Sequence, residues 1–282
     1  SELFEQICEL SYNDTARTEN WILEKNAGAV IDAAPVEAIV ELGAGSSKKT
    51  LHLLREQARW RGAGIFAPID VSLSSLVASR DFVRSTVPEI EFQGLHALYE
   101  TGLASIDFNL PTLFAFLGST IGNFNQTELP RFFRRLSAAM GPGDFFLLGV
   151  DRPKGVEILE KAYNDSQGVT AEFILNALTH ANRLLGANFS RDRMRYQCRY
   201  NIEWQQVEMH AVAEADQEIE LRSFGSSFLW REGEKILVEI SRKFDPLKLQ
   251  QQLRHFGLSP VAHYTDPREW FSLLLFKKTR FD

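Results

Sequence analysis

The segment ELGAGSSKKT, residues 41–50, is the clearest indication of the fold of this chain. It follows an apolar run at 38–42 that we expect to be a buried strand, and it leads into a helix predicted over 48–59. Gly43 and Gly45 permit a tight turn and a close approach of the backbone to a ligand. A GxG pattern alone is weak evidence because the third glycine of a dinucleotide fingerprint is missing, so a turn without a ligand stays open.

Strands and helices alternate beyond this turn. Asn125 stands three residues before Glu128 and directly after Phe124, which is typical of a helix N-terminus with a capping box and a hydrophobic staple. Such alternation implies a doubly wound, parallel sheet, so we predict an α/β fold with a Rossmann-like domain. The expected elements are strands at 64–69, 112–117 and 145–150, and helices at 72–87 and from Asn125 to about 140.

The pattern changes after Asp151. Residues 156–185 are predicted to be largely helical, whereas 194–241 alternates in twos and predicts antiparallel strands. Asp245-Pro246 then opens another helix, and two closing strands follow. The sequence therefore predicts an inserted α+β domain, with the first domain resuming after it. The closing strands are expected at 258–263 and 270–276, and the predicted domains are 17–153 with 244–282, and 1–16 with 154–243.

The composition limits the classes of protein to which this chain can belong. The chain has 282 residues, a net charge of −6 and 44% hydrophobic residues, so we expect a sizeable core and no binding of nucleic acid. No apolar run is long enough for a bilayer, and the N-terminus does not resemble a signal peptide. Cys8 and Cys198 form no CxxC pair, and the six histidines lack ligand spacing. We therefore expect a cytoplasmic, monomeric protein without a metal site.

Two acids flank the glycine turn. Glu41 ends the first strand, an arrangement commoner in enzymes that use S-adenosylmethionine than in nicotinamide enzymes. Asp70 ends the second strand, where a carboxylate can bond ribose hydroxyls. Asp70 could equally cap the helix that follows. Together these residues favour a nucleoside ligand at the carboxyl ends of the strands.

A second loop, FLGSTIGN at 116–123, ends another strand at the same edge. Gly118 allows a ligand to approach the backbone, and Thr120 adds a hydroxyl. Asn123 can both donate and accept hydrogen bonds, which suits a carboxylate or an amine. A solvated turn in which Asn123 caps the next helix is the alternative.

At this point the chain resembles the histidine-specific, S-adenosylmethionine-dependent methyltransferase family. The resemblance covers almost the whole chain at near-constant spacing, and its most specific segments are FLGSTIGN and LVEISRKF. The matching segments are ELGAGSSKKT at 41–50, PIDVS at 68–72, FLGSTIGN at 116–123, LLGVD at 147–151, AYNDSQGVTAEF at 162–173, VEMH at 207–210 and LVEISRKF at 237–244.

The resemblance implies a class I methyltransferase domain with a substrate-binding domain inserted. The implied reaction is N-methylation of the α-amine of L-histidine, up to the trimethylated betaine, as a step of ergothioneine biosynthesis. The cofactor would be S-adenosylmethionine, held by Gly43, Lys49, Asp70 and Tyr99. The amino-acid backbone would lie against Gly118, Thr120, Asn123 and Tyr163, of which Asn123 and Tyr163 are assigned to catalysis. Met209, Glu239 and Ser241 would line the imidazole pocket, with Phe4 closing one side.

The strand at the end of the insertion supports part of this assignment. A period of two predicts Leu237, Glu239 and Ser241 on one face, where a carboxyl and a hydroxyl could bond two imidazole nitrogens. A polar, solvated strand face is the alternative. Met209 could equally belong to a core, and Tyr163 could be an ordinary helix aromatic.

Two departures from the family pattern keep other functions open. Leu98 stands where the family has an acid near adenine, and 13–17 differs from the family's tyrosine-containing segment. The alternatives are the same chemistry on another amino acid or a modified histidine, and a decayed protein that only binds cofactor or amino acid. An NAD(P)-dependent oxidoreductase is disfavoured by the missing third glycine.

Overall fold

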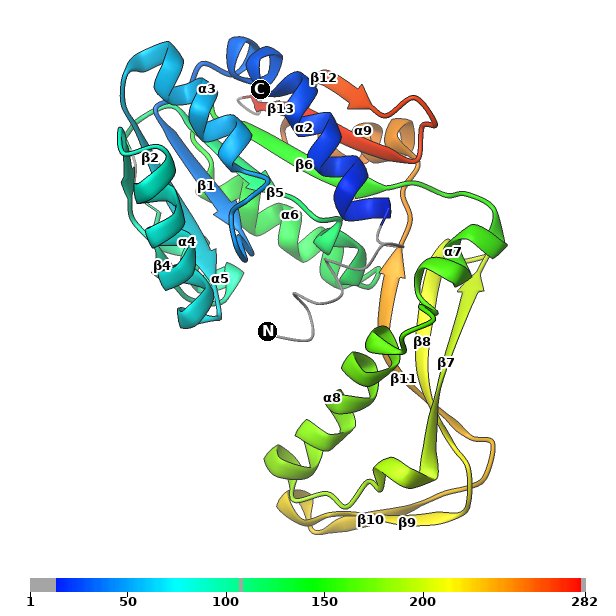
Figure 1. Ribbon diagram of the computed structural model, residues 1–282. Coiled ribbons are helices and arrows are strands. Elements are labelled where there is room, and N and C mark those ends of the chain that lie inside the picture. Colours follow the sequence, from blue (N-terminus) through cyan, green and yellow to red (C-terminus); the bar gives the residue numbers. More distant parts are fainter. Residues whose placement is uncertain (1–13, 107–108, 280–282) are drawn as a thin grey trace. The chain divides into compact units, whose positions relative to one another are not determined.

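The computed structural model describes residues 14–106 and 109–279 (Figure 1). Within these residues the chain divides into two compact units. We call Thr15–Pro153 with Lys243–Asp282 the sheet unit, and Lys154–Arg242 the insertion unit.

The sheet unit is built on an eight-stranded sheet in the order β12-β13-β6-β5-β1-β2-β3, with β4 paired to β2. The strands from β6 to β3 are parallel, as the alternating pattern predicts, whereas β13 and β12 pair antiparallel at one edge. The strands are β1 (Ala38–Leu42), β2 (Gly64–Asp70), β3 (Ile90–Phe92), β4 (Leu95–His96), β5 (Thr112–Phe116), β6 (Phe145–Asp151), β12 (Leu258–Thr265) and β13 (Phe271–Lys278).

Helices cover both faces of this sheet. Successive strand residues point to opposite sides, and in these strands both sets of side chains are apolar and need to be buried. Ile39 and Leu113 pack with α2, α3 and α4, whereas Val40 and Phe114 pack with α5, α6 and α9. The α/β, doubly wound prediction is thereby confirmed. The helices are α2 (Asp14–Ala33), α3 (Leu51–Arg61), α4 (Leu73–Thr86), α5 (Tyr99–Ala104), the 3-10 turn η1 (Thr120–Asn123), α6 (Glu128–Ala139) and α9 (Pro246–Arg254).

The N-terminus of α6 shows the predicted reciprocal contact, although the helix begins at Glu128 rather than near Asn125. The Asn125 side chain accepts the Glu128 N–H at 3.0 Å, and the Glu128 carboxylate accepts the Asn125 N–H at 2.8 Å. Phe124 packs on Phe132 with ring centres 5.1 Å apart. This contact fixes the exit from the loop 116–123.

The insertion unit holds two helices, a three-stranded antiparallel sheet and a two-stranded hairpin. The sheet has the order β11-β8-β7, and Leu175 and Met209 lie in the two apolar clusters formed between it and the helices. The elements are α7 (Val156–Ala162), α8 (Val169–Leu185), η2 (Arg191–Arg193), β7 (Met194–Asn201), β8 (Gln206–Ala213), β9 (Gln217–Leu221), η3 (Arg222–Phe224), β10 (Ser226–Trp230) and β11 (Lys235–Arg242).

The chain leaves the sheet unit shortly after Asp151 and returns to it at Lys243, and these two residues lie side by side. Asp151 ends β6, and Lys243 is the first residue after β11. Their side chains form an ion pair at 2.8 Å, with exposed fractions of 1% and 0%. The Phe244 N–H also donates to the Asp151 carbonyl at 2.9 Å. Such a buried pair is costly to break, because the remaining charge would be left without its partner.

Candidate active site

The glycine turn after β1 has the backbone that a close ligand approach requires. Gly43 and Gly45 have φ values of +71° and +50°, in the left-handed region where glycine is favoured. Ser47 adopts φ +54°, so a serine takes the third left-handed position of the turn. Its hydroxyl is held by Ser79 at 2.6 Å. The helix begins at Leu51, three residues later than predicted.

Asp70 fastens this turn to the end of β2. One carboxylate oxygen accepts the Gly45 N–H at 3.1 Å, and the other accepts the Ser72 N–H at 2.8 Å. The N-cap of α4 is Ser72, whose hydroxyl accepts the Ser75 N–H. The alternative in which Asp70 itself caps the helix is therefore wrong. Asp70 lies beside the glycine turn, where an acid can meet a ribose.

Tyr99 forms the wall beneath Gly43. A methyl group added at Gly43 would lie 2.8 Å from the Tyr99 hydroxyl oxygen, so the tyrosine side chain would have to shift to make room for it. The Tyr99 ring packs edge-on against Phe116, with ring centres 5.4 Å apart. Burial, with the nearby Asp70 and Glu100 carboxylates, raises the pKa of Tyr99 to about 12. The turn, the acid and this aromatic wall fit a nucleoside.

Glu41 lies behind the turn and is 3% exposed. Burial raises its pKa to about 8, against the opposing effects of Thr50 and Lys49. The neighbouring carboxylates of Glu19 and Asp70 raise it further. Among the described residues, Oε2 of Glu41 has no hydrogen-bond partner. An orphaned polar atom at the carboxyl edge of the sheet is a feature that a polar ligand could satisfy.

Glu19 is a buried residue that the sequence analysis missed. It lies on α2, and its side chain is 0% exposed. Both carboxylate oxygens accept the Gly118 N–H at 2.8 Å, and the carboxylate forms an ion pair with the Lys49 ammonium. A methyl group added at Gly149 on β6 would lie only 2.0 Å from Oε1, so the carboxylate lies directly on the strand. An acidic residue on an otherwise apolar helix face was the only available signal.

The loop after β5 places two consecutive residues in the left-handed region of backbone conformation. Gly118 and Ser119 have φ values of +76° and +55°, and the second is unusual for a residue with a side chain. The Ser119 hydroxyl accepts the Asp151 N–H at 2.9 Å and so ties the loop to β6. Thr120 donates to the Leu117 carbonyl at 3.0 Å, while Asn123 ends η1 and is exposed. Strain that is held by its surroundings is common at ligand sites.

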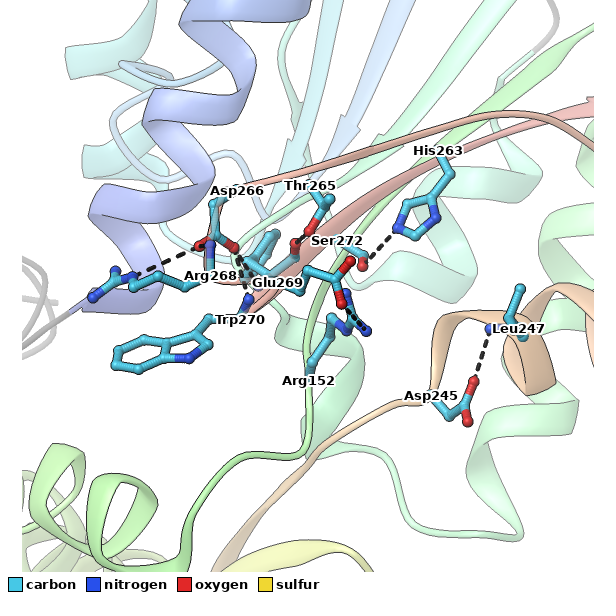
Figure 2. A network of polar contacts seen from close by, with 11 residues as sticks. Arg152, Asp245, Leu247, His263, Thr265, Asp266, Arg268, Glu269, Trp270 and Ser272 are labelled. Carbon is cyan, nitrogen blue, oxygen red and sulfur yellow. Dashed lines mark hydrogen bonds and ion pairs between the residues drawn. The ribbon is translucent and has the colours of Figure 1, made fainter.

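A polar network at the same edge of the sheet was also missed (Figure 2). Asp266, between β12 and β13, is 4% exposed and accepts the N–H groups of Trp270 at 2.8 Å and Phe271 at 2.9 Å. The Arg268 guanidinium lies 3.8 Å from the centre of the Trp270 ring. Arg152, just after β6, pairs with Glu269 at 3.4 Å. The network fixes the turn that borders the end of β6.

In the insertion unit, Tyr163, which directly follows α7, and Ser241 of β11 come together. Their hydroxyl oxygens are 2.7 Å apart. The Tyr163 carbonyl accepts the Tyr196 hydroxyl at 2.7 Å, and burial raises the pKa of Tyr196. Two residues distant in sequence thus form one hydroxyl pair. An ordinary helix aromatic, the alternative for Tyr163, would need no such partner.

Glu239 lies on the same strand face as Ser241, but Leu237 does not. Glu239 pairs with Met209, and Leu237 pairs with His210, because the register shifts between Leu237 and Glu239. The prediction that all three share a face is therefore wrong, since a bulge adds a residue to the strand. Burial raises the pKa of the Glu239 carboxyl. Met209 is 3% exposed and lies in an apolar cluster, which agrees with its core alternative.

Asp165 organises the segment between α7 and α8. Its carboxylate accepts the N–H groups of Gln167, Val169 and Thr170 at 3.1, 3.0 and 2.8 Å. Burial alone would raise its pKa, but these hydrogen bonds lower it. The segment that carries Tyr163 is thereby fixed to the start of α8.

Phe4 lies outside the described residues. In 14–106 and 109–279, no group of three or more His, Cys, Asp or Glu side chains could hold a metal ion. No helix in these ranges has both the length and the apolar character needed to cross a bilayer.

Comparisons of the sequence with known proteins find a matching family and several relatives. A family model described as "Histidine-specific methyltransferase, SAM-dependent" matches residues 1–278. The chain is 35% identical over 279 residues to the histidine N-alpha-methyltransferase of Mycobacterium tuberculosis, covering 99% of this chain and 87% of that protein. It is 34% identical over 191 residues to ergothioneine biosynthesis protein 1 of Neurospora crassa, covering 66% of this chain and 22% of that protein.

A solved structure supports the fold alone. The CcbJ methyltransferase from Streptomyces caelestis superposes with a TM-score of 0.51 at 13% identity, covering 92% of this chain and 90% of that one. The Rossmann-like sheet is therefore shared with a methyltransferase of very different sequence.

Proposed function

Because the chain belongs to the histidine-specific, S-adenosylmethionine-dependent methyltransferase family, we propose that it methylates the α-amine of L-histidine, up to the trimethylated betaine. One observation in particular supports histidine as the substrate. Glu239 and Ser241 lie on one face of β11 in the insertion unit, and Tyr163 is hydrogen-bonded to Ser241. A carboxyl and a hydroxyl on one face match the two nitrogens of an imidazole ring. The product is a precursor of the kind that ergothioneine biosynthesis requires.

In the proposed mechanism, S-adenosylmethionine supplies, when bound, an electrophilic methyl group on its sulfonium. The nucleoside part of the cofactor would be held by Gly43, Asp70 and Tyr99. Its methionine part would be held by Lys49. Gly118, Thr120 and Asn123 bind the backbone of the amino acid. Orienting the amine in a site with little water lowers the entropic part of the barrier.

Glu239 and Ser241 provide specificity for imidazole. The Glu239 carboxyl accepts a hydrogen bond from the ring N–H. The Ser241 hydroxyl, oriented by Tyr163, forms a hydrogen bond with the second ring nitrogen. Both groups would be left unpaired by a substrate without ring nitrogens, so such substrates should be rejected strongly. We assign Met209 and Phe4 to the walls of this pocket, and Tyr163 together with Asn123 to the substrate carboxylate.

The purified chain incubated with S-adenosylmethionine and each amino acid in turn tests the substrate. We expect histidine to gain up to three methyl groups by mass spectrometry. Methylation of another amino acid would refute the pocket assignment and keep the chemistry. Cofactor binding without any methylation would favour a decayed protein that only binds its ligands.

Glu239→Gln separates specificity from cofactor binding. We expect the ratio of kcat/KM for histidine over its 3-methyl derivative to fall, while the Kd for S-adenosylhomocysteine is unchanged. Glu157→Gln, an exposed position on α7, is the control. Equal losses of substrate and cofactor binding would contradict the imidazole role.

We also propose that the two units act as a cofactor domain and a substrate domain, and that the protein is a cytoplasmic monomer without a nucleic-acid partner. Its net charge of −6 supports the last point. Sedimentation of the purified chain checks the oligomeric state.

A further inference from the structure

The carboxylate of Glu19 is fully buried and is shared by two loops of the sheet unit. It bonds the amide of Gly118, which follows β5, and the ammonium of Lys49, which precedes α3. The residue itself comes from a third element, α2. A single side chain therefore connects three segments that are distant in sequence.

A charge without access to water persists only when it is paired and hydrogen-bonded. Glu19 meets both conditions through Lys49 and Gly118. The contact with Gly149, where a methyl group would come within 2.0 Å of Oε1, leaves the carboxylate little room to move. The position of the Lys49 ammonium is thus set by a rigidly held partner rather than by the flexible lysine side chain.

Lys49 differs from Glu19 in exposure. Its side chain is 29% exposed, while that of Glu19 is 0% exposed. A methyl group at Gly118 would lie 3.4 Å from Nζ, so the ammonium borders the loop after β5. An ammonium carries three donors, and Glu19 takes one of them. S-Adenosylmethionine has one anionic group, the carboxylate of its methionine part, and this is the natural partner of a lysine at the site.

We propose that Glu19 is a positioning residue: it holds the Lys49 ammonium toward the methionine carboxylate of the cofactor and ties that ammonium to the Gly118 amide. The inference rests on the cofactor of the proposed function and adds a residue to its site. Glu19 itself touches neither cofactor nor substrate, so its effect passes through Lys49 and Gly118.

Two ligands test this inference by calorimetry. S-Adenosylhomocysteine carries the methionine-type carboxylate, and 5′-methylthioadenosine has the same nucleoside without it. In Glu19→Gln we expect the Kd of S-adenosylhomocysteine to rise roughly 10-fold, as for the loss of one charge-assisted contact. The Kd of 5′-methylthioadenosine should change less than about 2-fold. Glu24→Gln, exposed on the same helix, is the matched control.

Lys49→Met should show the same selectivity, and the double variant Glu19→Gln/Lys49→Met should be no weaker than Lys49→Met alone. If Glu19→Gln does not fold, Glu19→Asp keeps the buried charge but retracts it, and the same selective loss is expected. Unchanged binding of S-adenosylhomocysteine, or equal weakening of both ligands, would overturn the proposal alone. A wild-type chain that binds neither ligand would overturn the cofactor assignment with it.

Discussion

Replacing Glu41 with Gln should change how the stability of the cofactor-free protein depends on pH. The pKa of this buried carboxyl is about 8 in the folded protein, against an ordinary value of 4.5. The folded state therefore holds a proton that the unfolded state releases between these values. Its contribution to stability is fully present below pH 4.5 and is lost as the pH rises through 8. Glutamine at this position has no such proton.

The size of the effect follows from linkage. At about 1.4 kcal/mol for each pKa unit, ionisation of Glu41 lowers the free energy of unfolding by about 3 kcal/mol between pH 5 and pH 8. The measured quantity is the difference between wild type and Glu41→Gln, so other titrating groups cancel. Burial is the main cause of the raised pKa.

Urea unfolding at pH 5, 6, 7 and 8, followed by the fluorescence of the five tryptophans, measures this difference. We expect the wild type to lose stability relative to Glu41→Gln by about 3 kcal/mol over that range. Glu89→Gln, at an exposed position, should show no such trend. A difference between wild type and Glu41→Gln that stays constant from pH 5 to pH 8 would contradict a raised pKa, because Glu41 would then be ionised throughout this range.

Three further variants test particular contacts. Gly43→Ala places a methyl group 2.8 Å from the Tyr99 hydroxyl at a φ of +71°, so we expect a stability loss of about 1–3 kcal/mol in urea unfolding; a wild-type midpoint would show that the turn relaxes. Asp266→Ala leaves buried N–H groups unsatisfied and should cost about 1–3 kcal/mol, with faster hydrogen exchange at the Trp270 amide as the local signature. Lys243→Met removes the ammonium that faces the buried Asp151 carboxylate and should cost about 3–5 kcal/mol, more than Lys248→Met at an exposed position; equal effects would contradict the importance of the buried pair.

The strands of the sheet unit were predictable because each is a short apolar run bounded by turn residues. That signal is local and survives in the folded chain. The two closing strands were found as strands, but their antiparallel pairing, of β13 with β6 and of β12 with β13, is encoded by no local pattern. The short strands β3 and β4 carry too few residues for any period to appear.

Candidate site residues were predictable where they stand at or just after the carboxyl end of a predicted strand, as Gly43, Asp70 and Gly118 do. They were not predictable where the contact comes from a residue distant in the sequence. Glu19 reaches Gly118 across 99 positions of sequence, and a buried acid looks like a surface acid until its partners are known. The bulge in β11 likewise defeats a strict period of two, because one extra residue moves Leu237 to the other face.

The roles of Phe4, Met209 and the catalytic pair Asn123 and Tyr163 remain predictions, because they depend on a bound substrate. The geometry around Tyr163 and Ser241 sharpens one of them, since a hydroxyl pair can orient a hydrogen bond that a lone hydroxyl would leave to rotate.

The ion pair between Asp151 and Lys243 has a consequence for how this architecture can diversify. It closes the point where the chain leaves the sheet unit and returns to it, with the Phe244 amide bonded to the Asp151 carbonyl. The ends of the segment between these two residues are therefore fixed on the sheet unit. Under the division of roles proposed above, that segment carries the imidazole pocket. Exchanging it for a segment with other pocket residues, with Asp151 and Lys243 retained, should then change the preferred side chain of the substrate while the strands of the sheet unit keep their register.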